Sequence, residues 1–295
     1  MNQTLKVLRI DHWHKNLFVL LGSIAAIEIC HQNYSFEQAW FMLLGFFLAC
    51  LVSSVNYVIN EFLDASYDAQ HPRKKDRPVV SGSINPQHLF FAASWFLILA
   101  VAIAAWLHNW AVSLGLMVLF GSGILYNVEP ARFKEVPVLD VLIESLNNPI
   151  RFVIGWYATA SPVGFPSIIL LCLVWMYGSF LMSSKRLAEK RFLGDRADVY
   201  RKTYRFYTEP SLKILTFLYA TITFLLYTAA SLLKSPNMVY AAPAVAIHIV
   251  WVFKLTLEKD SVMMDPEHAY RKRLFLLFSF LTLGIIVVLA ESSIR

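Results

Sequence analysis

The sequence contains few charged residues and few cysteines for its length. Only 16% of its 295 residues are charged, whereas 57% are hydrophobic. Soluble globular domains carry about 25% charged residues, so this composition excludes an ordinary soluble domain and favours a protein embedded in a bilayer. The three cysteines, Cys30, Cys50 and Cys172, form no C-x-x-C pair and show no metal-ligand spacing, and we interpret them as packing residues.

The chain also lacks the short motifs of several large enzyme classes. It contains no G-x-G-x-x-G, Walker loop, H-E-x-x-H or G-x-S-x-G. The eight histidines are scattered, and His12 with His14 does not by itself make a metal site. The N-terminus shows no cleavable signal pattern, so we expect the first apolar segment to be retained. We expect no nucleic-acid partner, because no basic soluble domain is present to hold a duplex.

Long apolar spans dominate the rest of the chain. A helix needs roughly 17 to 25 apolar residues to cross about 30 Å of hydrocarbon. The spans that meet this length cover residues 14–31, 38–58, 88–107, 110–127, 138–160, 166–184, 211–233, 236–256 and 274–290. The sequence therefore predicts an all-α integral membrane protein with nine transmembrane helices. We expect residues 1–295 to form a single transmembrane domain.

The positions of the basic residues predict how the chain is oriented. Every lysine and arginine except Arg151, Lys234 and Arg295 lies in or beside the N-terminal segment and the loops after the second, fourth, sixth and eighth spans. Under the positive-inside rule these segments face the cytoplasm. We expect a multi-pass protein of the inner (plasma) membrane, with the N-terminus in the cytoplasm and the C-terminus on the opposite side. The net charge of +6 then reflects topology and contact with anionic membrane lipids.

An acidic motif follows the second apolar span. Asn60, Asp64 and Asp68 are four residues apart, so on a helix their side chains share one face. Carboxylates at a bilayer edge face a water-filled cavity or a partner, and hard oxygen ligands suit Mg²⁺ that carries a phosphorylated substrate. Basic residues come directly afterwards: Arg73, Lys74, Lys75 and Arg77. The combination predicts a magnesium–diphosphate site that opens to the cytoplasm.

A second polar stripe interrupts the fifth span. Asp140, Glu144, Asn147 or Asn148, and Arg151 lie on one face of the expected helix. A buried ion pair between Glu144 and Arg151 that joins two helices would explain the stripe. The other explanation, which we favour, is that the stripe forms the opposite wall of the cavity that contains the acidic motif. For the charges from Lys190 to Lys213 we expect only the topological role.

Segment 60–82 resembles the first signature, Asn-Asp-x-x-Asp-x-x-x-Asp, of the UbiA superfamily of intramembrane prenyltransferases. This chain departs from the signature at Glu61. The continuation to Gly82 is similar to one branch, the decaprenyl-phosphate phosphoribosyltransferases. Three further segments are similar to that branch: Leu8–Phe18, Tyr126–Val141 and Phe180–Glu189. The branch is usually apolar or glycine-containing where this chain has Glu144, Asn147 and Asn148.

The resemblance implies a UbiA-type helical bundle around a central cavity open to the cytoplasm, and it implies roles for individual residues. The implied metal ligands, for Mg²⁺, are Asn60, Glu61, Asp64 and Asp68. The implied catalytic residues are Asn60, Asp64, Asp68, Lys185 and Arg186. The implied substrate-binding residues are Lys15, Lys74, Lys75, Arg77, Tyr126, Lys134, Asp140, Glu144 and Arg151.

The branch also implies a reaction, the transfer of 5-phosphoribose from phosphoribosyl diphosphate to a polyprenyl phosphate for cell-envelope glycan synthesis. The alternative is the commoner activity of the superfamily, prenyl transfer from a polyprenyl diphosphate to an aromatic acceptor. A transporter is disfavoured, because the charges cluster at one face and no inverted repeat is evident. The isoprenoid length, the number of Mg²⁺ ions and the formation of a homo-oligomer stay open.

Overall fold

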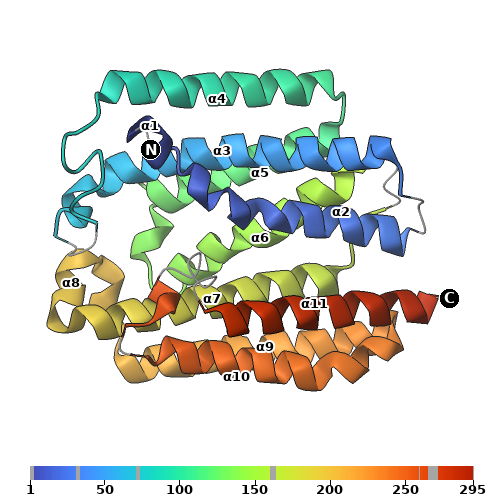
Figure 1. The fold of residues 1–295 in the computed structure, drawn as a ribbon. Helices are drawn as coiled ribbons and strands as arrows, with labels where there is room; N and C mark the ends of the chain where they lie inside the picture. Colours follow the sequence, from blue (N-terminus) through green and yellow to red (C-terminus); the bar gives the residue numbers. More distant parts are fainter. Residues whose placement is uncertain are drawn as a thin grey trace. The chain divides into compact units, whose positions relative to one another are not determined.

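The chain is helical throughout the residues that the structure describes. The computed structural model describes residues 3–30, 34–70, 74–159, 164–258, 260–264 and 272–294. Its long helices are α2 (Leu17–Ile29), α3 (Phe36–Asp68), α4 (Pro86–Trp106), α5 (Trp110–Asn127), α6 (Leu139–Ala158), α7 (Ile168–Leu193), α9 (Glu209–Lys234), α10 (Ala242–Thr256) and α11 (Arg273–Ile294). These ranges contain no β-strand, which confirms the all-α prediction (Figure 1).

Short helices connect the long ones. The α-helical connectors are α1 (Gln3–Val7) and α8 (Ala197–Tyr200). The 3₁₀ segments are η1 (Ile10–Asn16), η2 (Phe133–Glu135), η3 (Gly194–Arg196), η4 (Lys202–Arg205), η5 (Pro236–Ala241) and η6 (Val262–Met264).

Within the described residues, seven helical stretches are long and apolar enough to cross a membrane. They are Phe36–Asp68, Pro86–Trp106, Trp110–Asn127, Ile168–Tyr200, Glu209–Leu233, Pro236–Thr256 and Arg273–Ala290. The chain is therefore a multi-pass membrane protein. The predicted spans at 14–31 and 138–160 correspond to α2 and α6, which are not among the seven. Helix α2 has only 13 residues because η1 occupies the start of its span, and α6 carries the polar stripe.

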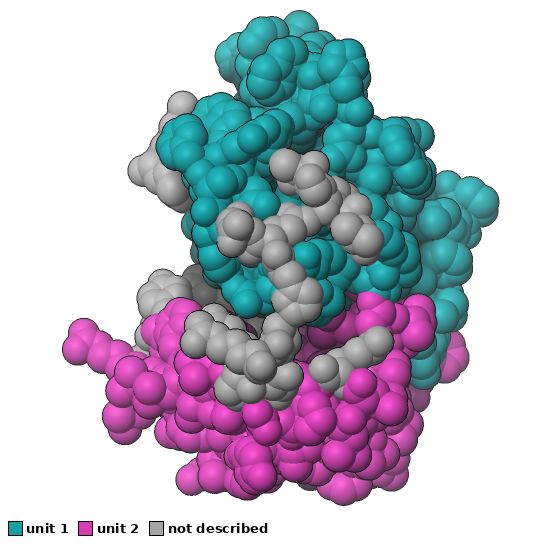
Figure 2. Space-filling view, turned by 90° about the vertical axis from the view of Figure 1, so that its right-hand side faces the viewer, with its two compact units in different colours: residues 1–166, 198–203 teal, residues 167–197, 204–295 magenta. Residues whose placement is uncertain are grey.

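The helices form two compact units (Figure 2). Unit 1 contains Met1–Pro166 together with Asp198–Thr203, and unit 2 contains Ser167–Ala197 together with Tyr204–Arg295. In unit 2, α7 packs on α9, and α10 contacts α7, α9 and α11. The single domain expected over 1–295 stays a prediction.

Unit 1 holds its helices together by close backbone contact and apolar packing. Helix α3 contacts α2, α4, α5 and α6. Gly22 of α2 and Gly155 of α6 allow these two helices to touch, because a Cβ on Gly155 would lie 1.8 Å from the carbonyl oxygen of Val19. Ser23 donates a hydrogen bond to the Gly155 carbonyl at 2.8 Å. Small residues at such contacts are typical of membrane helices, where dispersion and interhelical hydrogen bonds replace the hydrophobic effect.

The length of α3 brings the acidic motif out of the apolar region. Its 33 residues extend over about 50 Å at 1.5 Å per residue, which exceeds a hydrocarbon core of about 30 Å. The last turns, from Asn60 to Asp68, can therefore lie beyond the hydrocarbon. The loop between α5 and α6 reaches the same end of unit 1. In this loop Arg132 and Val138 adopt positive φ angles, 32° and 70°, which turn the chain sharply towards α3.

Candidate active site

Asp64 and Asp68 lie on one face of α3, and each faces a basic residue. The Asp64 carboxylate accepts a hydrogen bond from Lys134 and lies 3.6 Å from the Arg132 guanidinium. The buried Asp68 carboxylate pairs with Arg77 of the loop that follows α3. Helical spacing alone explains why the two carboxylates share a face. Both are placed next to groups that can bind phosphate oxygens.

Lys134 is held deep in the site by the loop between α5 and α6. Only 5% of its side chain is exposed. Besides Asp64, its ammonium group donates to the side-chain oxygen of Asn127 at 3.1 Å. Burial lowers the pKa of Lys134, and the neighbouring Asp64 carboxylate counters that effect. A basic group that is poorly hydrated in this way binds an incoming anion more strongly than a solvated one does.

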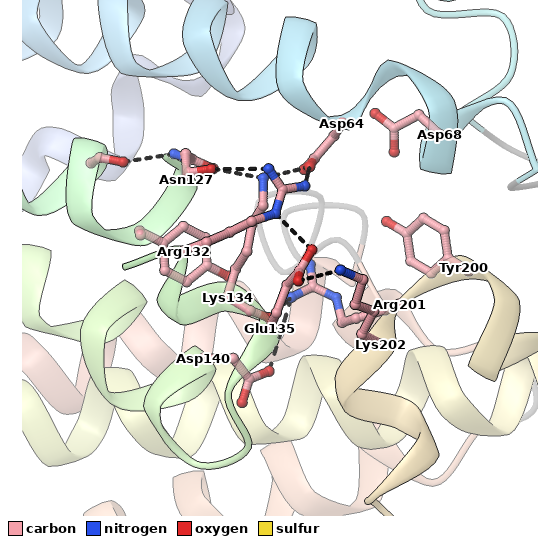
Figure 3. Close-up of polar contacts among 12 residues, drawn as sticks. Asp64, Asp68, Asn127, Arg132, Lys134, Glu135, Asp140, Tyr200, Arg201 and Lys202 are labelled. Atoms are coloured by element: carbon pink, nitrogen blue, oxygen red, sulfur yellow. Dashed lines mark hydrogen bonds and ion pairs between the residues drawn. The ribbon is translucent and has the colours of Figure 1, made fainter. Parts of the chain in front are cut away.

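Glu135 connects this loop to a distant part of the chain. Its carboxylate accepts from Arg132 Nε at 2.6 Å and from Lys202 Nζ at 2.6 Å. Arg201 lies 3.9 Å from the buried Asp140 carboxylate, and its guanidinium donates to the Lys134 carbonyl at 3.5 Å. Figure 3 shows these side chains converging from α3, the α5–α6 loop and the segment after α8.

The basic loop after α3 joins the same cluster. Lys74 donates a hydrogen bond to the Tyr200 hydroxyl, and its ammonium group lies 4.6 Å from the centre of the Tyr200 ring. Lys75 is exposed. Arg73 lies outside the described residues, as do His71 and Pro72 of segment 60–82.

A small cavity lies in the middle of the cluster. Its volume is about 30 Å³. It is lined by Asp64, Tyr67, Asp68, Arg132, Lys134, Glu135, Tyr200, Arg201 and Lys202.

Glu61 points to a different set of partners. It is buried, accepts a hydrogen bond from the Val79 backbone N–H at 3.4 Å, and lies 4.0 Å from the Arg9 guanidinium. Asn60 is half-buried one residue earlier on α3. The Glu61 carboxylate thus tethers the loop after α3 to the N-terminal segment, while Asp64 and Asp68 face the cavity.

The donor set fits a Mg²⁺ ion that is shared with a substrate. Among the described residues no group of three His, Cys, Asp or Glu side chains could hold a metal. Mg²⁺ usually keeps several waters and is bound by one or two carboxylates together with substrate phosphates. Asp64 and Asp68, with the amide of Asn60, offer hard oxygen atoms of that kind.

The stripe on α6 meets polar partners from other helices of unit 1. The Tyr126 hydroxyl donates to Glu144 at 2.8 Å. The buried Arg151 guanidinium donates to Asn16 at 2.7 Å and contacts Asn148 and Ser53 at 3.4 Å. The half-buried Lys15 precedes Asn16 in η1. Glu144 and Arg151 therefore each have a partner on another element of unit 1.

Lys185 and Arg186 belong to α7 in unit 2. Arg186 is buried, and its guanidinium lies 3.9 Å from the Glu189 carboxylate, which accepts from the Tyr204 hydroxyl at 2.6 Å. Lys185 is half-buried. Their predicted part in the site stays a prediction.

Besides Tyr67 of α3, sequence reasoning missed five residues that line the cavity: Arg132, Glu135, Tyr200, Arg201 and Lys202. The first two lie inside the quoted segment Tyr126–Val141, so its alternating charges were an available signal. The other three lie in the loop to which only a topological role was assigned. That interpretation missed the contacts of Arg201 and Lys202, because no local pattern links the loop to residues about seventy positions earlier.

Comparisons with known proteins agree with the resemblance in the sequence. The model of the UbiA prenyltransferase family matches residues 18–277. The decaprenyl-phosphate phosphoribosyltransferase of Mycolicibacterium smegmatis is 27% identical over 224 residues, which cover 76% of this chain and 68% of that protein. The protoheme IX farnesyltransferase of Stenotrophomonas maltophilia is 30% identical over 164 residues, 55% of this chain and 51% of that protein.

A solved structure shows the same fold. A UbiA homolog from Archaeoglobus fulgidus bound to GPP and Mg²⁺ matches with a TM-score of 0.72 at 20% identity, covering 98% of this chain and 100% of that chain. The predicted resemblance to the UbiA family is confirmed, and so is the predicted resemblance to the decaprenyl-phosphate phosphoribosyltransferase branch. The chain is an all-helical membrane transferase that belongs to the UbiA prenyltransferase family.

Proposed function

We propose that this protein transfers 5-phosphoribose from phosphoribosyl diphosphate to a polyprenyl phosphate such as decaprenyl phosphate, in a Mg²⁺-dependent reaction. The observation that carries the proposal is the pairing of Asp64 and Asp68 with Lys134 and Arg77, in a site that also gathers further cations. Two anionic substrates repel each other in water, and such a site offsets the repulsion. The name of the Mycolicibacterium smegmatis relative supports the same acceptor and the same transferred group.

The chain's own residues have distinct roles in this reaction. Asp64 and Asp68, with Asn60, would hold Mg²⁺, which neutralises charge on the diphosphate. Arg77, Arg132 and Lys134 bind diphosphate oxygens and stabilise the charge that develops on the leaving group. We retain Lys74, Lys75, Lys185 and Arg186 as further phosphate-binding groups.

The proposed reaction breaks one bond and forms one bond, and it needs no proton transfer. The bond between ribose C1 and the diphosphate oxygen breaks, and the diphosphate leaves with the electron pair. An oxygen of the lipid phosphate forms the new bond to C1 through an oxocarbenium-like transition state. Because the nucleophile is already an anion, the chain needs no strong general base.

The membrane arrangement is part of the proposal. The polyprenyl chain reaches the site from the bilayer, while phosphoribosyl diphosphate comes from the cytoplasm. We therefore propose that α2 and α6 complete a nine-span bundle, and that the site lies in a cavity open to the cytoplasmic face of the plasma membrane. The asymmetry of lysine and arginine between alternate loops supports this orientation.

A direct assay tests the reaction. Purified protein in detergent is given radiolabelled phosphoribosyl diphosphate, Mg²⁺ and polyprenyl phosphate, and label in the organic phase is counted. We expect lipid-linked label that requires Mg²⁺ and is lost in the Asp64→Asn/Asp68→Asn variant. The exposed Glu258, which pairs with Lys272 in unit 2, provides a control, because Glu258→Gln should leave transfer unchanged. Wild-type protein that leaves all label in water would reject the proposal.

Prenyl transfer to an aromatic acceptor is the second candidate. It is favoured by the similarity to a protoheme IX farnesyltransferase and by GPP in the Archaeoglobus fulgidus homolog. Repeating the assay with a labelled prenyl diphosphate and a hydroxybenzoate discriminates the two reactions. Labelled aromatic product, with no response to phosphoribosyl diphosphate, would establish this second function.

A further inference from the structure

Segment Asp198–Thr203 brings charged side chains from a distant part of the sequence to the candidate site. This segment belongs to unit 1, although the residues on both sides of it belong to unit 2. It contributes Tyr200, Arg201 and Lys202 to the walls of the cavity. Tyr200 accepts a hydrogen bond from Lys74 of the loop after α3, but the proposed function gives Arg201 and Lys202 no role, so their presence needs a separate explanation.

Glu135 binds the cations of this part of the site with both carboxylate oxygens. Oε1 accepts from Arg132 Nε and Oε2 accepts from Lys202 Nζ, each at 2.6 Å. The side chain is 20% exposed, and Lys202 is 47% exposed. Each carboxylate oxygen thus accepts from one cation, and cations bind the oxygens of a phosphoryl group in the same pattern.

The size of the cavity limits what can bind while Glu135 stays in place. A volume of about 30 Å³ holds about two water molecules, since one water needs about 10–15 Å³ of such space. A phosphoryl group is larger than that. A phosphoryl group that takes the place of Glu135 on Lys202 inside this cavity therefore displaces the Glu135 carboxylate, which is a side-chain movement in a partly exposed loop.

We propose that Lys202, with the neighbouring Arg201, forms a second anion subsite for the 5-phosphate of the sugar donor, and that Glu135 is the internal counter-anion of Lys202 until the donor binds. This inference rests on the proposed function. It assigns the diphosphate to Asp64, Asp68 and their cations, and the other phosphoryl group to the segment after α8. A phosphate dianion replaces a carboxylate monoanion on Lys202, and the exchange is favoured by the additional charge.

The subsite explains how the site could select its donor. A prenyl diphosphate has one anionic end, so it gains nothing from Arg201 or Lys202 and leaves Glu135 bound to Lys202. A phosphoribosyl donor has two anionic ends and engages both groups. Selection then depends on a second charge-assisted contact.

The test uses ribose 5-phosphate and inorganic diphosphate as separate probes, each titrated into the full-length protein in detergent with Mg²⁺. We expect Lys202→Gln to weaken ribose 5-phosphate binding by about tenfold, the factor that corresponds to about 1.4 kcal/mol. Diphosphate binding should change by less than about twofold, because that group is held elsewhere.

Glu135→Gln should tighten ribose 5-phosphate binding, because a competing anion is removed. Lys213→Gln, an equally exposed lysine paired with Glu209, is the matched control and should change neither affinity.

Several results would overturn the inference. They are no binding of ribose 5-phosphate to wild-type protein, equal weakening of both probes by Lys202→Gln, and weaker ribose 5-phosphate binding in Glu135→Gln. The transfer assay separates this failure from failure of the proposed function. If wild-type protein makes lipid-linked phosphoribose but Lys202→Gln leaves the ribose 5-phosphate affinity unchanged, only the subsite is rejected.

Discussion

Asp64 and Asp68 differ from an ordinary solvated pair of acids because each faces a cation supplied by another part of the chain. Lys134 approaches Asp64 from the α5–α6 loop, and Arg77 approaches Asp68 from the loop after α3. Individual side chains therefore define the charge distribution of the site, and single conservative substitutions can probe it.

We expect Asp64→Asn to lower transfer activity by at least about 10²-fold, the scale for loss of a preorganised electrostatic contact. The amide oxygen still accepts from Lys134, so the melting temperature should change little. Turnover is measured across Mg²⁺ concentrations, with the exposed Asp76→Asn in the loop after α3 as control. Near-normal turnover at limiting Mg²⁺ would remove Asp64 from the metal site.

Glu61 gives a second prediction for a single residue. Its carboxylate accepts from the Val79 N–H and faces Arg9, so an uncharged Gln can keep the link to the loop. We expect Glu61→Gln to leave the half-saturating Mg²⁺ concentration within about twofold of wild type, whereas Asp68→Asn should raise it by about tenfold or more. A large rise in the Mg²⁺ requirement of Glu61→Gln would restore Glu61 to the ligand set implied by the sequence.

At the scale of elements, α6 and the α5–α6 loop connect different parts of unit 1 to the site. The stripe on α6 reaches Tyr126 on α5 through Glu144, and it reaches Asn16 of η1 through Arg151. One helix face therefore joins two neighbouring elements, which a contact only between Glu144 and Arg151 would not do.

We expect the changes in the free energy of unfolding caused by Glu144→Leu and Arg151→Met to be nearly additive, because the two side chains bind different partners. The coupling energy should be below about 0.5 kcal/mol. The double variant should fold and be inactive. Urea or thermal unfolding of the single variants and the double variant, with turnover measured on each, tests this. A strong coupling together with a fully active double variant would instead support a structural ion pair.

The link between Glu135 and Lys202 gives a prediction for pH dependence. Burial tends to raise the pKa of Glu135, but hydrogen bonds from Lys202 and Arg132 hold it below the ordinary value of 4.5. The hydrogen bond that Lys202 donates to Glu135 raises the pKa of Lys202 above 10.5. The link therefore contributes its full stabilisation of the folded protein between pH 4.5 and pH 10.5. This contribution falls as the pH drops through the folded pKa of Glu135.

We expect the difference in melting temperature between wild type and Glu135→Gln to be constant from about pH 5 to pH 9, and to shrink below about pH 4. Calorimetric or fluorescence melting curves of both proteins over this range provide the measurement. A difference that grows on acidification would contradict the assigned sign.

For the molecule as a whole, the family match extends from residue 18 to residue 277 and so includes parts of both units. The seven apolar helical stretches establish a multi-pass protein, and the orientation is open to a direct test. We expect a membrane-impermeant thiol reagent to label Ser83→Cys, in the loop after α3, only from the cytoplasmic side. Phe165→Cys, an exposed position between α6 and α7, should be labelled only from the opposite side.

Intact cells and inverted membrane vesicles supply the two orientations, and the parent chain measures background from Cys30, Cys50 and Cys172. Labelling of both positions from the same side would exclude the nine-span topology, because an odd number of crossings must separate them.

Composition and spacing determined much of this protein before any fold was known. Apolar spans locate the membrane helices because the bilayer demands a minimum apolar length, and four-residue spacing places Asp64 and Asp68 on one face because the helix repeats every 3.6 residues. Both rules are local. Hydropathy nevertheless ended the second span at residue 58, whereas α3 continues to Asp68, because backbone hydrogen bonding does not stop where apolar residues stop.

Only the tertiary structure decided which charges meet. Three hydrogen bonds of the site join residues that are 18 to 70 positions apart: Lys134 to Asp64, the Val79 N–H to Glu61, and Lys202 to Glu135. Their pairing depends on where loops return after leaving a helix, which is set by packing and by turns such as those at Arg132 and Val138. The sequence could thus predict the acidic residues and the cations Lys134 and Arg77, while the pairing of these charges and the contributions of Arg132, Arg201 and Lys202 became identifiable only in three dimensions.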